Sequence, residues 1–474
     1  MNHDEWHDAL MMGVKDLWGI LSPVQRHVRL EDLRGKTLAV DLSIWVVEVQ
    51  GMKQLQGVNK PHLRNIFFRA HKLLQLGILP IFVLEGNPPP LKFETMMKRA
   101  YGLAYKSGSA PPKNMGRSHF KSKLKECAEM LQYMGVTCVQ SVGEAEAFCA
   151  LLNKHGLVDA CVTEDGDAFL YGARTVYRNF TINDKDPSVE IYEMDDIELT
   201  LGLTQENLVA MGILLGCDFV PKGVPGVGRE MCLKLLNSLP SVNILERMKQ
   251  WRSLSPADIM NTRVKVKDVA HCDNCSHPGT LRDHNKNGCS LCGTSKECKL
   301  SQSEELCPCH WHAARTAVTN RSAEMSIYKK AMLDPAFPHP QVIKEFLSAK
   351  DKLPPGGWFW KQPVMFQMQK YASDKLEWEE KYTQEKMLPL LTLWTQRQIL
   401  ETGRTGALQP LRIVKCRVQK RIPVYEVEWH KPANDDTTEE THYTTIEEQD
   451  LFNNCFPQIK EEFTQRTEEE AARK

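Results

Sequence analysis

Acidic residues that could bind divalent cations recur along this 474-residue sequence, directly after short apolar segments or at the start of a helical pattern. There are seven of them: Asp41, Glu85, Glu144, Glu146, Asp165, Asp167 and Asp218. Any one of them alone could be an ordinary helix cap or turn residue. Seven acids gathered in one partly desolvated cleft would repel each other unless cations neutralised them. Sites made only of carboxylates suit Mg²⁺ or Mn²⁺ rather than zinc. Two such ions about 3.5–4 Å apart can activate a water and stabilise the leaving oxygen in phosphodiester hydrolysis.

The elements that would position these acids belong to an α/β core over residues 12–220. Helical apolar spacing covers His62–Leu76 and Phe120–Met134. Three short apolar segments are typical of buried parallel strands: Thr37–Asp41, Ile78–Leu84 and Asp159–Thr163. Because ligands bind at the carboxyl ends of the strands in open parallel sheets, we expect the acids to converge at one sheet edge.

Composition limits the class of protein. The chain is 42% hydrophobic and 25% charged, which favours a folded protein with a large core over a disordered one. The apolar run Val209–Cys217 is too short to span a bilayer, and the first residues are acidic where a signal peptide would be basic. We therefore expect a protein that is neither secreted nor membrane-spanning.

The formal net charge of zero conceals an uneven distribution of charge. Residues 433–474 contain twelve acids and four bases, so the rest of the chain is net positive. Between Glu85 and Lys125 there are nine Lys and Arg residues and only two acids. Local basic patches bind phosphate whatever the total charge, so a nucleic-acid partner remains compatible with this sequence.

Six motifs, in order, resemble those of the XPG/flap-endonuclease family, and with a terminal module at residues 408–465 the resemblance is strongest to the GEN-type Holliday junction resolvases. The motifs are Met12–Trp18, Val40–Trp45, Phe82–Gly86, Gly143–Ala147, Thr163–Asp167 and Leu215–Phe219. The family's metal-binding acids match the seven acids above one for one, and none is substituted.

The resemblance implies a parallel-sheet nuclease core, a helical helix–two-turn–helix region and a small C-terminal α+β chromodomain-like module. The implied regions are an N-terminal nuclease region (12–107), an internal nuclease region (132–218), a helical region (219–400) with a Cys/His-rich insertion (271–312), and the terminal module (408–465).

The resemblance also implies an activity. It is the cleavage of branched duplex DNA with Mg²⁺, or alternatively Mn²⁺, as the metal ion. The enzyme would resolve four-way junctions by paired symmetric nicks and would also cut forks and 5′ flaps. Its setting would be homologous recombination and DNA repair. The enzyme would form a homodimer on the junction, bind no membrane, and be nuclear or shared between nucleus and cytoplasm. The alternatives are a flap or bubble nuclease acting as a monomer and a non-catalytic DNA-binding scaffold, and the intact acids argue against the scaffold.

Two features are expected to contact DNA near the acids. The glycines Gly223, Gly226 and Gly228 permit tight turns whose backbone amides could approach a phosphate. With Lys222, Arg229 and Lys234 they resemble the family's helix–two-turn–helix, which often holds a K⁺ ion. Lys92 and Arg99 are two helical turns apart and would share one face. A basic pair of this kind is usually solvated surface, but the matching residues of the family steer the scissile phosphate.

The Cys/His-rich insertion predicts a structural zinc site. Two CxxC pairs lie about a dozen residues apart, and Cys272, Cys275, Cys289 and Cys292 are the expected ligands. The alternative is an insertion that is rich in cysteine without binding metal.

In the terminal module, Leu411–Val418 and Val424–Trp429 alternate as antiparallel strands do, and Ile446–Phe463 is expected to be helical. The module resembles a chromodomain, but Thr445-Ile446-Glu447 replaces the usual Thr-Trp-Glu, so an aromatic cage for methyl-lysine would be incomplete. We expect a DNA-contacting or scaffolding platform whose positive charge comes from Arg412, Lys415, Arg417, Lys420 and Arg421.

Relatives in the family begin at the Met-Gly that is Met12-Gly13 here. The eleven preceding residues include Asp4, Glu5 and Asp8. We expect a chain that starts at Met12 to cut junctions faster than one that starts at Met1, because the extension adds negative charge near the DNA. Equal cleavage rates for the two chains would contradict this expectation.

Overall fold

The computed structural model describes residues 13–50, 59–93, 96, 117–182, 187–239, 242–256, 270–298, 322–404, 408–419, 422–430 and 442–473. Arg99, Lys420 and Arg421 lie outside the described residues. The chain divides into two compact units. The first contains Val24–Asp195 and Leu347–Lys474, and the second contains Met12–Pro23 and Asp196–Phe346.

The first unit is built on a seven-stranded sheet with the order β1-β7-β6-β5-β2-β3-β4. Neighbouring strands from β6 to β4 are parallel, whereas β7 and β1 add antiparallel pairs at one edge. The three predicted strands are confirmed. The strands are β1 (Arg26–Arg29), β2 (Thr37–Asp41), β3 (Leu79–Leu84), β4 (Thr137–Gln140), β5 (Ala160–Val162), β6 (Thr175–Thr181) and β7 (Ser188–Glu193).

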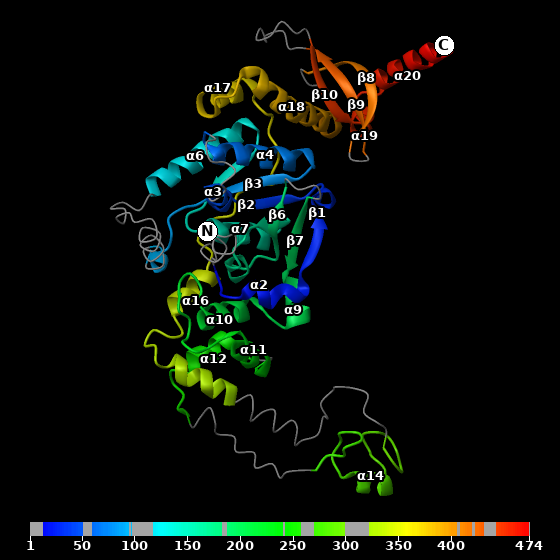
Figure 1. The fold of residues 1–474 in the computed structure, drawn as a ribbon. Helices are drawn as coiled ribbons and strands as arrows, with labels where there is room; N and C mark the ends of the chain where they lie inside the picture. Colours follow the sequence, from blue (N-terminus) through cyan, green and yellow to red (C-terminus); the bar gives the residue numbers. More distant parts are fainter. Residues whose placement is uncertain are drawn as a thin grey trace. The chain divides into compact units, whose positions relative to one another are not determined.

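Helices cover both faces of this sheet. On one face, α3 (Leu42–Gln50), α4 (Pro61–Gln75) and α6 (Arg117–Tyr133) pack against each other and against β3 and β4. Figure 1 shows α7 (Ala145–Lys154) on the other side, where it packs on β2, β3 and β5. The chain therefore runs outward from β2 through β3 to β4 and then returns to place β5 beside β2. This reversal is the topological switch point at which open α/β sheets form their ligand sites.

The core on the α4 face follows from helical periodicity. Apolar residues of α4 recur at intervals of three and four and are fully buried against the sheet and α6. Two later helices, α17 (Met365–Leu376) and α18 (Glu380–Thr402), extend this core, and Met387 and Leu390 of α18 belong to it. Leu388, also on α18, belongs to a second core beneath the terminal module.

The terminal module has three antiparallel strands in the order β10-β9-β8, followed by two helices. Its elements are β8 (Pro410–Gln419), β9 (Ile422–His430), β10 (His442–Glu448), α19 (Gln449–Cys455) and α20 (Pro457–Ala472). The prediction of β8 and β9 is confirmed. The prediction that the helix starts at Ile446 is wrong, because residues up to Glu448 form β10. Tyr443, Thr445 and Glu447 are buried while the residues between them are exposed, which is the period of two of a strand.

Two aromatic residues of β9, Tyr425 and Trp429, belong to the core of the module. Tyr425 and Trp429 are buried on β9, and the Trp429 ring packs edge-on against Phe452 and Phe456 of the helical segment. The indole Nε1 of Trp429 donates a hydrogen bond to Oγ1 of Thr445 at 2.7 Å. Neither side chain is available to an external methyl-lysine, in agreement with the incomplete motif.

The second unit is helical. The apolar run predicted around Val209 forms most of α10, which is buried along one continuous stretch from Leu208 to Leu215. No helix among the described residues is both long enough and apolar enough to cross a bilayer. The helices of this unit include α2 (Leu17–Leu21), α10 (Gln205–Leu215), α11 (Arg229–Ser238), α12 (Ile244–Gln250), α14 (Leu281–Asn287) and α16 (Pro340–Leu347). The helix α9 (Met194–Leu201) and the 3₁₀ turn η1 (Ser22–Val24) lie at the boundaries between the units. The first unit also contains α8 (Asp167–Leu170) and the 3₁₀ turns η2 (Leu30–Leu33) and η4 (Pro90–Lys92).

Trp429 gives a test of the module core. Trp429→Ala removes a fully buried ring and the hydrogen bond to Thr445, so we expect the free energy of unfolding to fall by about 3–5 kcal/mol. Val418→Ala on β8 is the control, because the Val418 side chain is 72% exposed and its loss should change stability by less than about 0.5 kcal/mol. Urea unfolding measures both variants, and equal stabilities would contradict the assigned core.

Candidate active site

The carboxyl ends of β2 and β3 each present a carboxylate that a backbone amide holds in place. Asp41 is the last residue of β2 and is buried, and its Oδ1 accepts a hydrogen bond from the Ser43 amide at 2.8 Å. Glu85 directly follows β3, and its Oε2 accepts from the Ala145 amide at the start of α7 at 3.1 Å. The two strands are parallel neighbours, so both carboxylates lie at the same sheet edge.

The N-terminus of α7 adds two more carboxylates. Glu144 is the N-cap residue of α7 and Glu146 lies in its first turn, and both are buried. Lys92 Nζ forms a close ion pair with Oε2 of Glu144. Within the part of the chain that the structure describes, the buried Oε1 of Glu144 has no hydrogen-bond partner. A cation would satisfy this oxygen.

The loop after β5 supplies the third pair. Oγ1 of Thr163 donates to Oε1 of Glu146 at 3.2 Å and accepts from the Asp165 amide at 3.1 Å. Asp165 Oδ1 in turn accepts from the Asp167 amide at 2.9 Å, and α8 begins at Asp167. Both aspartates are buried. Thr163 therefore links α7 to the β5 loop, a role that its place between an apolar strand and two acids could have suggested.

Burial and mutual repulsion raise the pKa values of Asp41, Glu85 and Glu146. Desolvation raises the pKa of Asp41 to about 6 and that of Glu85 to about 8, and the negative charge of Glu144 contributes to both shifts. Lys92 opposes the shifts through its positive charge. The carboxylates are thus close enough to influence one another.

Burial and repulsion between charges also act on Glu146 of α7. Burial raises the pKa of Glu146 well above its ordinary value, and the charges of Asp165, Asp167 and Asp41 add to this shift. Six carboxylates therefore share one buried edge, where the nearby cation Lys92 offsets only part of their charge. Hard divalent cations fit this donor set, because its oxygens are all carboxylate and one of them lacks a partner.

Asp218, the seventh predicted acid, belongs to the second unit. It is buried, and it follows α10 in a tight turn where Cys217 and Val220 form a backbone bridge. Its contribution to the same edge as the other six remains a prediction.

The predicted glycine turn lies between α10 and α11. Gly223 and Gly226 have φ values of +56° and +75°, which residues with a Cβ rarely adopt. A Cβ on Gly223 would also lie 2.5 Å from the backbone carbon of Leu215, so the turn requires glycine at this position. Gly228 is the N-cap residue of α11 in extended conformation. Gly226 and Gly228 are exposed, so the N-terminus of α11 lies at the surface. The Gly223 amide donates to the Val220 carbonyl within the turn, and the contact of this turn with DNA remains a prediction.

The cations around this turn differ in their availability. Lys222 and Lys234 are exposed. Arg229 pairs with Asp16 at 3.4 Å and donates to the Gly19 carbonyl at 3.0 Å, so part of its donor capacity is used within the unit. Lys330 was not predicted. Its Nζ donates to the Gly226 carbonyl at 2.6 Å, but it is more than a hundred residues away in the sequence and follows no motif.

The four predicted zinc ligands lie close together but divide between two groups of side chains. Cys275 is common to both groups, Cys272 belongs to one, and Cys289 and Cys292 belong to the other. Each group also contains a histidine, His284 in one and His277 in the other, and sequence spacing alone had not selected either.

Comparisons with known proteins identify the family. The XPG N-terminal domain matches residues 12–102, the XPG I-region matches residues 135–218, and the chromatin organization modifier domain 2 matches residues 409–465. The flap endonuclease GEN-like 1 of Arabidopsis thaliana is 31% identical over 458 residues, which cover 89% of this chain and 75% of the relative. This chain belongs to the GEN flap endonucleases.

Two further relatives support the assignment. The flap endonuclease GEN homolog 1 of Homo sapiens is 46% identical over 454 residues, which cover 94% of this chain but 50% of the relative. The chain thus spans about half the length of this human relative. A crystal structure of human GEN1 in complex with Holliday junction DNA has a TM-score of 0.74, 38% identity, and coverage of 98% of this chain and 100% of that one. The predicted resemblance and fold class are confirmed.

The basic residues expected on the module of this GEN-family chain are largely paired. Arg412 on β8 binds Glu428 on β9 through Nε and Nη2 at 2.6 and 3.2 Å. Lys415 lies 3.6 Å from the Glu426 carboxylate, and Arg417 pairs with the same group. The hydrogen bond from Arg412 holds the pKa of Glu428 below its ordinary value. These carboxylates on the neighbouring strand reduce the positive charge that the sequence predicted for this face.

The raised pKa values predict how stability depends on pH. The folded, ion-free protein binds more protons at Asp41 and Glu85 than the unfolded chain does, so their contribution to stability is full below the ordinary carboxyl pKa. It is lost as the pH rises through about 6 to 8. Mg²⁺ can replace the lost protons, so we expect it to raise the melting temperature more at about pH 8.5 than at about pH 5.5. Equal Mg²⁺ shifts at both pH values, with NaCl of matched ionic strength as control, would contradict the charge assignment.

Proposed function

We propose that this chain is a structure-specific DNA endonuclease that resolves four-way junctions by paired symmetric nicks through two-metal hydrolysis of phosphodiesters. The observation that carries the proposal is the group of six carboxylates at the switch point of the parallel sheet. Backbone amides hold three of them, Asp41, Glu85 and Asp165. Burial raises the pKa of Asp41, Glu85 and Glu146. The likeness to a GEN1 structure that holds Holliday junction DNA supports branched DNA as the substrate.

The proposed catalytic group consists of the seven acids and the basic side chains of Lys92 and Arg99. Asp41, Glu85, Glu144, Glu146, Asp165, Asp167 and Asp218 would hold two Mg²⁺ ions, with Mn²⁺ as an alternative. Bound ions of this kind activate a water and stabilise the developing charge on the leaving oxygen. The chain itself fixes the carboxylates, since amides of Ser43, Ala145 and Asp167 each hold one oxygen in place.

Lys92 has a separate proposed role. It pairs with Glu144, and its side chain is only 15% exposed, so it lies at the acids rather than on an open surface. In the family pattern this lysine and Arg99 steer the scissile phosphate. A cation beside the acids would also reduce the repulsion between the carboxylates and an approaching phosphate.

The glycine turn is the proposed second contact with duplex DNA. The amides of Gly226 and Gly228 and the exposed Lys222 and Lys234 would bind one strand, with Arg229 beside them. Gly223 would shape the turn, because its amide already donates to the Val220 carbonyl at 3.0 Å. A K⁺ ion bound by carbonyls of this turn is part of the proposal. Because Lys330 donates to the Gly226 carbonyl, K⁺ would have to use other carbonyls or displace this lysine.

One set of acids can align one water with one phosphate and therefore makes one nick. Resolution of a junction requires two symmetric nicks, so we propose that two copies assemble on a two-fold junction. The same site would cut forks and 5′ flaps. The biological setting would be homologous recombination and DNA repair in the nucleus. The structural zinc proposed for the Cys/His segment is chemically separate, since its ligands are thiolates and imidazoles rather than carboxylates.

The catalytic proposal predicts the effect of neutralising Asp41. Asp41→Asn keeps the shape of the side chain but removes one negative charge from the metal site, so we expect Mg²⁺-dependent nicking to fall by about 100-fold or more. Asp195→Asn is the matched control, because Asp195 pairs with Arg174 at the surface and its side chain is 81% exposed. Undiminished cleavage by Asp41→Asn, in a variant that still binds DNA and gives a native circular dichroism spectrum, would contradict the site.

A supercoiled plasmid that extrudes a cruciform separates the resolvase from a monomeric flap or bubble nuclease. Paired nicks within one binding event convert the plasmid directly to linear DNA. A single nick relaxes the plasmid and removes the cruciform before a second cut can occur. We expect linear product at saturating protein, whereas mainly nicked circles would favour the flap-nuclease alternative.

A further inference from the structure

The described residues 270–298 form a small substructure whose buried core consists of cysteine. Cys272, Cys275 and Cys289 are buried together, and Cys292 and Cys298 pack against them. Two of the large apolar side chains nearby, Leu281 and Leu291, are 39% and 50% exposed. A segment of this size with so little apolar surface to bury needs another source of stability, which small domains usually obtain from disulfides or metal ions.

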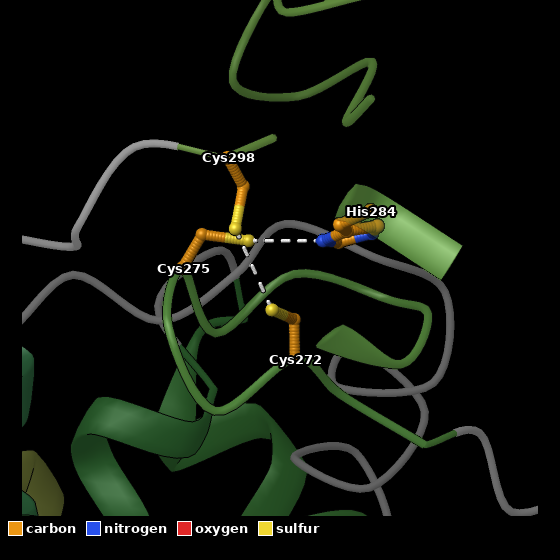
Figure 2. A group of neighbouring side chains, drawn as sticks. All are labelled: Cys272, Cys275, His284 and Cys298. Carbon is orange, nitrogen blue, oxygen red and sulfur yellow. Dashed lines mark hydrogen bonds between the residues drawn. The ribbon is translucent and has the colours of Figure 1, made fainter. Parts of the chain in front are cut away.

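Figure 2 shows the first group of potential ligands, Cys272, Cys275, His284 and Cys298, whose ligand atoms all lie within 4.8 Å of one another. The Cys272 and Cys298 sulfurs are 3.6 Å apart, and Cys275 Sγ is 3.3 Å from Nδ1 of His284. The two sulfurs are too far apart for a disulfide, whose S–S bond is about 2.05 Å long. All five cysteines are free thiols.

The imidazole of His284 is oriented as a ligand. Its Nε2 lies 2.9 Å from the Pro278 carbonyl oxygen, which can only accept a hydrogen bond, so Nε2 carries the proton. In the neutral ring Nδ1 is then unprotonated and directed at the sulfurs. Carbonyl groups commonly orient metal-binding histidines in this way. A capping box between Thr280 and Asp283 begins α14, which carries His284.

The second group consists of Cys275, His277, Cys289 and Cys292, and its ligand atoms also lie within 4.8 Å of one another. His277 Nδ1 is 3.4 Å from the sulfur of Cys289 and 3.4 Å from that of Cys292. A backbone bridge between Cys289 and Thr294 turns the chain so that Cys289 and Cys292 approach the histidine together. Cys275 is the single residue that both groups contain.

We propose that residues 270–298 bind two zinc ions that share the thiolate of Cys275. Two tetrahedral ions need eight ligand positions, and the seven side chains supply eight only if one of them bridges. Zinc–sulfur bonds of about 2.3 Å and zinc–nitrogen bonds of about 2.0–2.1 Å place tetrahedral ligands about 3.8 Å (S···S) and about 3.6 Å (S···N) apart. The observed separations of 3.3 to 3.6 Å are close to these values.

Both ions would be structural. Each has three thiolates and one imidazole, which completes a tetrahedral shell and leaves no position for a water or substrate. Two divalent cations would offset four of the five thiolate charges, which lowers the cost of burying them. The assignment replaces the single four-cysteine site expected from the sequence with two overlapping sites. The two-zinc proposal does not depend on the proposed nuclease function, since the experiment that tests it measures the metal content of the protein.

Metal analysis of the full chain tests the stoichiometry. The protein is loaded with excess zinc, desalted and measured by mass spectrometry of the element, and we expect two zinc ions per chain. Cys275→Ser should lose both ions, whereas His284→Ala and His277→Ala should each retain about one. Cys416→Ser and His155→Ala are the controls, because both residues are exposed and lie outside the two groups, and both variants should retain two ions.

Three outcomes would overturn the proposal: one zinc or none in the unaltered chain, a full ion retained by Cys275→Ser, or loss of zinc in Cys309→Ser, whose cysteine lies outside the described residues.

Loading with Co²⁺ gives an independent measurement that needs no variant. Two cobalt ions bridged by a thiolate couple magnetically, so the electron paramagnetic resonance signal should grow with the first equivalent and decline with the second. A signal that grows in proportion through both equivalents would contradict the shared thiolate.

Discussion

The repulsion among six carboxylates at one largely buried sheet edge is the constraint on which the first unit depends. Each of these charges would be more stable in water, and burial together with repulsion raises the pKa values of Asp41, Glu85 and Glu146. The fold nevertheless keeps them together, because parallel strands and their reversal after β4 bring the ends of β2, β3 and β5 to one edge. Backbone amides that point at Asp41, Glu85 and Asp165 prevent these side chains from turning away. The repulsion thus lowers the stability of the ion-free fold at this edge, and bound cations would offset that cost.

The sequence could predict this arrangement because each part of it has a local signal. The strand Thr37–Asp41 is apolar up to its last residue, which is an acid, and the structure forms β2 over the same residues. Glu144 precedes a helical pattern and is the N-cap of α7. A charged residue is unfavourable inside a buried strand, so the first acid after an apolar segment marks the end of the strand. The same acid then faces either solvent or a ligand, so it indicates both the strand and the site.

The parts that could not be predicted depend on pairings between distant residues. Lys330 reaches the Gly226 carbonyl, and Arg412 binds Glu428 across a strand pair, yet no spacing in the sequence connects either pair. The same holds for the cysteines, since CxxC spacing marks ligands but does not indicate which histidine completes each group. The error at β10 has a different cause. The segment from Ile446 is expected from the sequence to be helical, but Glu447 is buried and accepts a hydrogen bond from Gln396 of α18 at 2.6 Å.

Helix α18 has two buried sides, and this limits how the polypeptide can be divided. Met387 and Leu390 fill the core over the large sheet, while Leu388, with Leu391 and Ile399, packs beneath the terminal strands. A shortened polypeptide that stopped after α18 would leave these last three side chains facing water, on a helix that the remaining core still holds in place. Conversely, the terminal strands transplanted to another protein would lack the surface that covers Trp429 and Phe452. The smallest transferable piece of the terminal module therefore includes α18, although the sequence places a region boundary between them at residues 401–407.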